Sequence, residues 1–485
     1  MKNRIFSVLL ALLAILSVSC GGGASDPVTT TDGNDTTAPE ETQRTDGLPD
    51  TDMNGFTLNI LHHDNSWLTW AKIDLTADEE NGDLINDAIY KRNMYLEDRF
   101  NCNLNIVGVP QVANVFKEVV LSGDGSYDII MQYGINVCGN IEYLSDMNNL
   151  SYVNFDADYW NPNATGIFRV GDKQIAAAGN FTLSYMSGAA CLLFNKQIYD
   201  DLRIADDPYE LVRQKKWTVD KFYEIAKQGI ADLNGDTQIT ALDDRKGVTG
   251  SLRGYYNMLM AGANVRYFEM DKDNYPFFAL AENESSINFL QHLLDLATSE
   301  PEVFMHDNVT NVWDSMPTLG FEDGGSLFGY YHIFGVTNLR DMKDDFGILP
   351  APMRDENQDK YYSYTNIGEI ATLPRSFDPS RADYVGMLME AMCFYSQENI
   401  VPTYKEVVVQ TKTTRDDESV EMLDYVFDGI SFDYGVVVLA NDTSNVLMTD
   451  VFRPKATTLV SKLTTMKSKL DAQIGTIIDA VNDMP

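Results

Sequence analysis

The sequence has few basic residues. Its 485 residues include 36 lysines and arginines against 72 aspartates and glutamates, which gives a formal net charge of −36 at pH 7. Nucleic acids and anionic lipid surfaces attract proteins of the opposite charge. The shortage of positive charge therefore argues against both as partners, and it is compatible with a soluble protein outside the cell.

Cysteine and recognisable catalytic motifs are scarce as well. Only five cysteines occur; Cys102, Cys138, Cys191 and Cys393 stand among apolar residues, so we expect buried small side chains and no disulfide scaffold. The sequence lacks a Gly-x-Ser-x-Gly elbow, a His-Glu-x-x-His helix and a phosphate loop. Carboxylates for a glycosidase pair are abundant but are spread along the whole chain. We therefore predict that the protein is not an enzyme.

A hydrophobic run occurs at the start of the chain. The apolar residues from Ile5 to Val18 are too few to span a bilayer and are typical of a secretion signal. The run ends at Leu16-Ser17-Val18-Ser19-Cys20, which resembles a bacterial lipobox. The resemblance implies that residues 1–19 are a signal peptide and that Cys20 carries lipid such as palmitate. Cys20 would then anchor the protein to the extracytoplasmic face of the cell membrane. Secretion with an unmodified Cys20 is the alternative.

The segment after Cys20 has a composition that disfavours folding. Residues 20–54 contain no aromatic side chain and are rich in Thr, Asp, Gly and Pro. Such a segment buries too little apolar surface to offset the loss of chain entropy. We therefore predict a lipid-anchored, disordered tether. About 430 residues remain from Gly55 onward, more than one hydrophobic core usually supports, so we expect two lobes.

The first part of the remaining chain alternates between strand and helix patterns. The predicted elements are a strand at 56–60, a helix at 83–100, a strand at 104–109, a helix at 112–121 and a strand at 127–131. This order is typical of a parallel sheet covered by helices, and so of an α/β fold. Ligands of such sheets bind at the carboxyl ends of the strands. We therefore expect a binding site at the loops after His62 and Met131.

Further elements are expected later in the chain. They are a strand at 189–194, a helix at 219–231 capped by Thr218, a strand at 325–328 and an extended segment at 348–350. A final stretch, Val451 to Val481, carries apolar residues at steps of three or four and is interrupted by Pro454. It predicts closing helices, because its spacing drifts from the strict heptad of a coiled coil.

Several short motifs occur in an ordered series. They are Tyr127-Asp128-Ile129-Ile130, Leu193-Phe194-Asn195-Lys196, Trp217-Thr218-Val219-Asp220-Lys221-Phe222, Phe346-Gly347-Ile348-Leu349-Pro350-Ala351-Pro352 and Thr372-Leu373-Pro374-Arg375-Ser376. Each motif is weak alone. Their order and spacing behind a lipobox resemble the family 1 extracellular solute-binding proteins of bacterial ABC importers.

The resemblance implies a two-lobed, type II periplasmic-binding-protein-like fold whose discontinuous lobes are joined by a hinge. Lobe 1 would hold residues 55–174 and 366–403, and lobe 2 residues 175–365 and 404–485. It also implies a monomeric receptor that closes over a small polar ligand, which we expect to be a carbohydrate, and presents it to an ABC transporter permease. Peptides or other nutrients are alternative ligands, and a glycan-active enzyme or a surface adhesin is an alternative function.

Sugar capture needs aromatic faces against the rings, and carboxylates or amides for the hydroxyls, in a cleft that excludes water. Side chains of these types occur at predicted strand ends and loops. The candidates for ligand binding are Asp64, Asn65, Trp67, Tyr133, Trp160, Tyr255, Trp313 and Tyr330.

One acidic segment resembles the calcium loop of a dockerin or EF-hand. Oxygen donors stand at its positions 1, 3, 5, 7, 9 and 12, and they are Asp232, Asn234, Asp236, Gln238, Thr240 and Asp243. Thr237 stands where Gly usually permits a sharp turn, and Asp244 is an alternative ligand. We predict structural calcium here. A metal shared by His62 and His63 is not expected, because consecutive strand residues face opposite sides.

Overall fold

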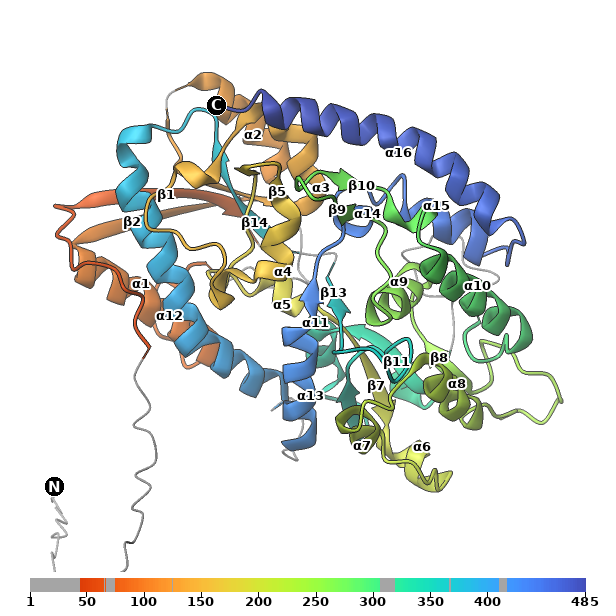
Figure 1. Cartoon of the computed structure of the whole chain (residues 1–485). Helices are drawn as coiled ribbons and strands as arrows, with labels where there is room; N and C mark the ends of the chain where they lie inside the picture. Colours follow the sequence, from red (N-terminus) through yellow and green to blue (C-terminus); the bar gives the residue numbers. More distant parts are fainter. Residues whose placement is uncertain are drawn as a thin grey trace, which may run out of the picture. The chain divides into compact units, whose positions relative to one another are not determined.

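The structure is a computed structural model that describes residues 44–64, 66, 75–123, 125–305, 319–365, 368–409 and 417–485. The chain divides into Met1–Thr45 and Asp46–Pro485, and the folded body lies in the second part. Its strands form two principal sheets flanked by helices, so the fold is α/β with two lobes (Figure 1). None of the helices within these ranges has the length and hydrophobicity needed to cross a bilayer.

The sheet of lobe 1 has the strand order β2-β1-β3-β14-β4. Its strands are β1 (Phe56–His63), β2 (Cys102–Val109), β3 (Ile129–Tyr133), β4 (Leu144–Ser145) and β14 (Glu369–Pro374). Strand β1 pairs in parallel with β2 and β3, and β14 runs antiparallel to β3 and β4. Helices α1 (Leu84–Phe100) and α2 (Val112–Ser122) connect the parallel strands. The predicted strand-helix order is therefore confirmed.

Helix α1 shows how local sequence sets the lobe 1 core. Asp83 caps its first turn, and Asn101 ends it in the left-handed conformation. The helix packs against the long helix α12 (Ala382–Val409), which returns to lobe 1 from a distant part of the sequence (Figure 1). Leu58 and Ile60 of β1 are buried in the same core as α12 residues such as Leu388.

The sheet of lobe 2 has the strand order β12-β7-β11-β8. Its strands are β7 (Ala190–Asn195), β8 (Lys246–Thr249), β11 (Ser326–His332) and β12 (Phe346–Leu349). These positions confirm the predicted strand at 189–194, and β11 extends farther than its predicted end. Helix α8 (Val219–Gln228) begins at Thr218, whose hydroxyl accepts a hydrogen bond from the Lys221 N–H at 3.3 Å. The predicted cap is therefore correct.

Two chain segments run side by side where the lobes meet. Ala177 forms a bridge with Ala371 of β14, and Ala189 forms a bridge with Thr365, both antiparallel. The short helix α5 (Ser184–Ser187) lies between the first members of these pairs. Ala177, placed in lobe 2 by the sequence, thus pairs with a strand of the lobe 1 sheet.

The end of the segment predicted as a tether is part of the folded body. Arg99 of α1 pairs with Asp46, and the Met53 N–H donates to the Phe100 carbonyl at 2.8 Å. The Met53 side chain is only 3% exposed. The tether boundary predicted at Asn54 therefore lies too far along the chain, because composition gave no weight to these contacts with α1.

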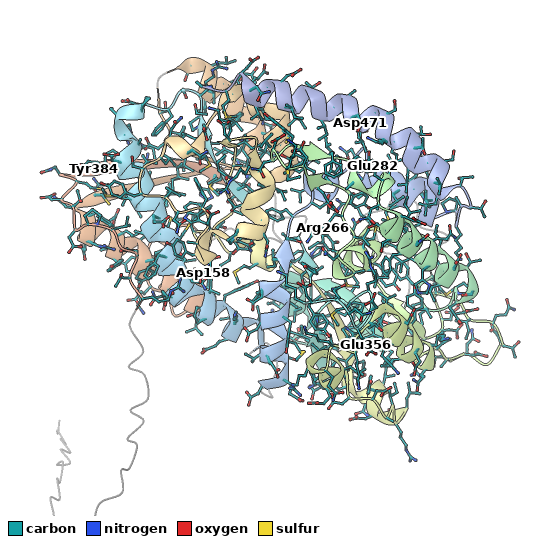
Figure 2. The ribbon with its side chains drawn as sticks, in the orientation of Figure 1. Asp158, Arg266, Glu282, Glu356, Tyr384 and Asp471 are labelled. Carbon is teal, nitrogen blue, oxygen red and sulfur yellow. The ribbon has the colours of Figure 1, made fainter. Side chains whose placement is uncertain are left out.

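The C-terminal helix α16 (Leu459–Asn482) contacts elements of both lobes. It packs against the 3₁₀ turn Cys138–Tyr143 near lobe 1 and against the turn Ala279–Ala281 of lobe 2 (Figure 1). Lys467 of α16 forms ion pairs with Glu282 and Asp471, which are labelled in Figure 2. The residues buried along its length, which confirm the predicted apolar stripe, are Leu459, Leu463, Met466, Leu470, Ile474, Ile477 and Val481.

The remaining elements surround the two sheets. The other helices include α3 (Gly134–Val137), α4 (Pro162–Thr165), α6 (Lys196–Asp201), α7 (Pro208–Arg213), α9 (Leu252–Gly262), α10 (Glu284–Ser299), α11 (Ile333–Val336), α13 (Asp417–Asp428), α14 (Tyr434–Val437) and α15 (Ser444–Leu447). Three strand pairs are β5 (Arg169–Val170) with β6 (Lys173–Gln174), β9 (Glu269–Met270) with β10 (Pro276–Phe277), and β13 (Ser363–Tyr364) with β15 (Ile430–Ser431). Of the cysteines, Cys102, Cys191 and Cys393 are buried as free thiols, and Cys138 is half-buried.

Candidate functional site

A large cavity lies between the two lobes. Its volume is about 1230 Å³. Lobe 1 lines it with residues at the ends of β1 and β3, His63 and Tyr133, and with Ile135 and Asn136 just beyond. Lobe 2 lines it mainly from β11 and α11. The cavity therefore lies where the carboxyl ends of the parallel strands were expected to place a site.

The lobe 1 wall is built around a buried histidine and carboxylate. The side chains of His63 and Glu369 are 2% and 0% exposed. Glu369 Oε1 accepts the His63 backbone N–H at 2.8 Å and contacts ring atom Nδ1 at 2.9 Å. The Tyr133 ring lies against the His63 ring, with 4.3 Å between centroids. Burial, together with the nearby Glu369 charge, raises the pKa of Tyr133, so its hydroxyl stays neutral.

The lobe 2 wall is a chain of neutral hydrogen-bonding groups. His332 Nδ1 lies 2.7 Å from the Gly188 carbonyl, and Nε2 lies 2.8 Å from the Tyr330 hydroxyl. Because a carbonyl only accepts, Nδ1 carries the proton and Nε2 accepts from Tyr330. The Tyr364 hydroxyl lies 2.7 Å from that of Tyr330 and also donates to the Gly254 carbonyl at 3.3 Å. Burial lowers the pKa of His332 to about 4, so the ring is neutral at pH 7.

Aromatic faces and charged groups complete the lobe 2 side. The Phe334 ring stacks on His332 with centroids 5.3 Å apart, and both residues line the cavity. Arg253, in the first turn of α9, also lines the cavity; its Nε donates to Ser444 at 3.2 Å and its Nη2 to the Val436 carbonyl at 2.9 Å. The other charged lining residues are Glu322, Asp323, Asp341, Lys343 and Asp344. The cavity thus offers apolar ring faces beside hydrogen-bond donors and acceptors.

Two of the predicted ligand-binding residues line this cavity, and two lie elsewhere. Tyr133 and Tyr330 are in its walls. Trp160 is fully buried in lobe 1, where its Nε1 donates to Glu390 at 2.6 Å. Tyr255 is fully buried in lobe 2, stacked on Phe304 with centroids 4.0 Å apart. These two rings pack in the cores of their lobes and do not line the cavity.

The remaining candidates lie beside the cavity or outside the described residues. Asp64 follows His63 and accepts the Ser66 N–H at 2.9 Å, but it does not line the cavity. Asn65, Trp67 and Trp313 fall outside the described residues, as does Cys20. Their predicted roles therefore stay predictions.

Sequence reasoning missed the two histidines and Glu369. His63 ends β1 as Tyr133 ends β3, so the strand-end rule that selected Tyr133 applied to His63 equally. In the sequence, His63 stands out only as a neighbour of His62 in a pair that resembles metal ligands. Glu369 gave no local signal, because it contacts a residue 306 positions away in the sequence.

In the loop predicted to bind calcium, backbone N–H groups of the loop donate to its own carboxylates. The Asp232 carboxylate accepts N–H groups of Gly235 and Thr237 at 2.6 and 2.7 Å. Thr237 has φ of 71°, the left-handed conformation that Gly usually provides at this loop position. The fully buried Asp244 accepts the N–H of Thr240 at 2.8 Å. Asp244 therefore holds the last part of the loop, at Thr240, against the protein interior.

Carboxylates of this loop are thus directed at backbone N–H groups. Within the described ranges, no three His, Cys, Asp or Glu side chains are grouped so that they could hold a metal ion. Calcium binding stays a prediction for the residues of this loop, which are Asp232, Asn234, Asp236, Gln238, Thr240 and Asp243.

The solved structures that are similar to this chain include two substrate-binding proteins. An ABC substrate-binding protein from Listeria monocytogenes, in complex with cycloalternan, matches with a TM-score of 0.51 and 12% identity over 87% of this chain and 99% of that one. The cyclic alpha-maltosyl-1,6-maltose binding protein from Arthrobacter globiformis matches with a TM-score of 0.51 and 14% identity over 88% and 98%. No protein-family model and no curated protein matches the sequence. At these identities the likeness shows the fold, which is the two-lobed fold of ABC substrate-binding proteins.

Proposed function

We propose that this chain is the substrate-binding protein of an ABC importer and that it captures an oligosaccharide between its lobes. The observation that carries the proposal is the cavity itself. Aromatic rings such as Tyr331 and Phe334 line it beside polar and charged groups such as Asn136 and Asp341. Ring faces match the C–H surfaces of sugars, and carboxylates and amides match their hydroxyls.

The size of the cavity favours a ligand of several sugar units. Small-molecule pockets usually measure about 300–1,000 Å³, whereas this one measures about 1230 Å³. The two solved structures of similar fold bind cyclic oligosaccharides according to their names. Both considerations favour oligosaccharides over monosaccharides, and the second name favours α-linked glucans in particular. Family 1 of the solute-binding proteins remains the expected family.

Ligand capture would proceed by closure of the lobes. The walls of the cavity come from both lobes, so a ligand that contacts both stabilises the closed arrangement over the open one. No covalent step is required. A lipid on Cys20 would hold the receptor at the outer face of the membrane beside its permease.

Calorimetry and thermal shift with purified protein test the proposal. The probes are cycloalternan, cyclic maltosyl-maltose, maltotetraose and a panel of short peptides. A glycan that binds only the folded state must raise the melting temperature in a concentration-dependent way. We expect this rise with at least one glycan. A rise with peptides alone, or with no probe, would contradict the proposed ligand class.

A turnover assay separates the receptor from a glycan-active enzyme. We expect the bound glycan to be recovered chemically unchanged after long incubation with the protein. Shorter glycans among the products would instead establish hydrolysis and remove the receptor assignment.

A further inference from the structure

Glu369 is a buried carboxylate with an unusual set of partners. Its side chain is fully buried, and its Oε1 serves His63 twice, through the backbone N–H and through Nδ1. Its other oxygen, Oε2, is also buried, and no described residue hydrogen-bonds it. Leaving a buried polar oxygen without a hydrogen-bond partner costs stability. Both described hydrogen bonds of the Glu369 side chain therefore go to one residue, His63, which lines the cavity.

A second buried glutamate of lobe 1 has hydrogen-bond donors for both of its carboxylate oxygens. Glu390 accepts from the Tyr159 hydroxyl at 2.6 Å on Oε1, and from Trp160 Nε1 at 2.6 Å and the Asn154 N–H at 3.1 Å on Oε2. Both oxygens have donors, and Glu390 does not line the cavity between the lobes. Glu369 differs because its partner is a cavity residue.

The contacts of Glu369 fix the orientation of the His63 ring. The Glu369 backbone N–H donates to the Ser184 hydroxyl at 2.9 Å, which attaches the start of β14 to helix α5. The carboxylate then holds Nδ1 of His63, and the Tyr133 ring packs against the imidazole. Nδ1 carries a proton toward the carboxylate, so Nε2 is the ring nitrogen left to interact with the contents of the cavity.

The histidine of the opposite wall has no such nitrogen. Nδ1 of His332 is held by the Gly188 carbonyl and Nε2 by the Tyr330 hydroxyl. In His63, by contrast, the described residues hydrogen-bond Nδ1 alone. The two histidines line one cavity, and of the two only His63 has a ring nitrogen that no described residue hydrogen-bonds.

We propose that His63 Nε2 hydrogen-bonds a hydroxyl of the bound glycan and that Glu369 is the positioning residue that holds the ring for this contact. The inference rests on the proposed function and deepens it. A hydroxyl donates to Nε2 of a neutral imidazole and accepts from Nε2–H of a protonated one. A polyhydroxylated ligand is therefore matched to His63 in either charge state.

Substitution by asparagine tests the ligand contact. In His63→Asn the amide N–H₂ stands near the place of Nδ1 and keeps a donor for Glu369, while nothing replaces Nε2. We expect its Kd for the glycan that binds the parent, among cycloalternan, cyclic maltosyl-maltose and maltotetraose, to rise about tenfold. The matched control is His62→Asn, because His62 is a buried neighbour on β1 that does not line the cavity. Its Kd should stay within about twofold of the parent.

The positioning role of Glu369 has its own readout. Glu369→Gln keeps an oxygen that accepts from Nδ1, whereas Glu369→Leu removes it. We expect the glutamine variant to retain most of the affinity and the leucine variant to lose as much as His63→Asn. When His63→Asn and Glu369→Leu are combined, the two losses of affinity should not add, because both changes remove the same interaction with the glycan. Additive losses would overturn the positioning role.

Nuclear magnetic resonance of the imidazole nitrogens gives a second measurement that does not depend on a variant of Glu369. The chain has five histidines, so the spectrum is simple and His63→Asn assigns its signals. Glycan addition should shift Nε2 of His63 more than its Nδ1. An unshifted Nε2, or an unchanged Kd in His63→Asn while the parent binds glycan, overturns this inference alone. Failure of the parent to bind any of the glycans overturns the proposed function as well.

Discussion

The two walls of the cavity use the same residue type in different ways. In the lobe 2 wall, His332 is enclosed in a neutral chain that runs from Tyr364 through Tyr330 to the Gly188 carbonyl. In the lobe 1 wall, His63 is held at one nitrogen by the buried carboxylate of Glu369. The lobe 2 arrangement occupies both ring nitrogens of His332. The lobe 1 arrangement holds the His63 ring in place and leaves its Nε2 available. The partners of a histidine, more than its presence in a cavity, determine its role.

Removing the lobe 2 histidine should have the largest effect. His332→Leu leaves the Gly188 carbonyl and the Tyr330 hydroxyl without their partner, and each buried unpaired group costs about 1–3 kcal/mol. We expect the free energy of unfolding to fall by about 3 kcal/mol, measured by denaturant titration without ligand. His292→Leu is the control, because His292 lies at the surface in a pair with Asp220. Equal free energies of unfolding for the two variants would show that this chain of hydrogen bonds does not stabilise the lobe 2 wall.

Acid should weaken the same wall through His332. Its pKa lies near 4, below the ordinary 6.5 of histidine. Between pH 4 and 6.5, His332 binds a proton in the unfolded chain but not in the folded protein. Stability that is present above pH 6.5 is therefore lost as the pH falls toward 4. The advantage of the parent over His332→Asn, which cannot titrate, should therefore shrink by about 2 kcal/mol across this window.

The measurement is a difference between two proteins because another group titrates nearby in pH. Burial raises the pKa of Asp433 to about 6 from 3.8. Its contribution has the opposite sign, since stability from the protonated folded form is lost as the pH rises through 6. Asp433 is present in both proteins, so its effect cancels. A constant difference from pH 7 to 4 would mean that His332 does not titrate as described.

Ligand affinity should distinguish a wall residue from a core residue. Tyr330→Phe removes the hydroxyl that joins His332 to Tyr364, so we expect about tenfold weaker glycan binding by calorimetry. Trp160→Phe alters the lobe 1 core and should lower the melting temperature without changing Kd. Weaker glycan binding by Trp160→Phe, with unchanged binding by Tyr330→Phe, would instead support the predicted role of Trp160 in the ligand site.

Calcium should give the smallest effect. We expect calcium at about five to ten times its Kd to stabilise the parent by about 1 kcal/mol, seen as a rise in melting temperature. Asp236→Ala should abolish the rise, because Asp236 stands at position 5 of the loop. A parent that is insensitive to calcium would show that hydrogen bonds to Asp232 and Asp244 suffice to close the loop.

Local patterns predicted much of the fold. The apolar spacing of residues 459–481 identified every buried position of α16, and Thr218 identified the first residue of α8. Both signals act between residues close in sequence, within one helix. The boundary at Asn54 failed for the opposite reason, because Met53 is buried against a helix that begins about thirty residues later.

The candidate site was predictable only in part. The strand-end rule located the loops after His62 and Met131, and it selected Tyr133. The sequence does not separate the aromatic residues that line the cavity from those in the cores, because both kinds of ring look alike in sequence. Trp160 donates to Glu390, 230 positions away, and no local pattern marks that contact.

The sequence by itself determined the acidic charge, the α/β order of elements and the edge of the sheet where a site would form. These follow from composition and from periodicities of two and 3.6 residues, which short segments carry. Only the tertiary structure decided which polar groups meet. Glu369 reaches His63 because β14 returns beside β3 after more than two hundred residues, and this pairing makes one histidine of the cavity available while the other is enclosed.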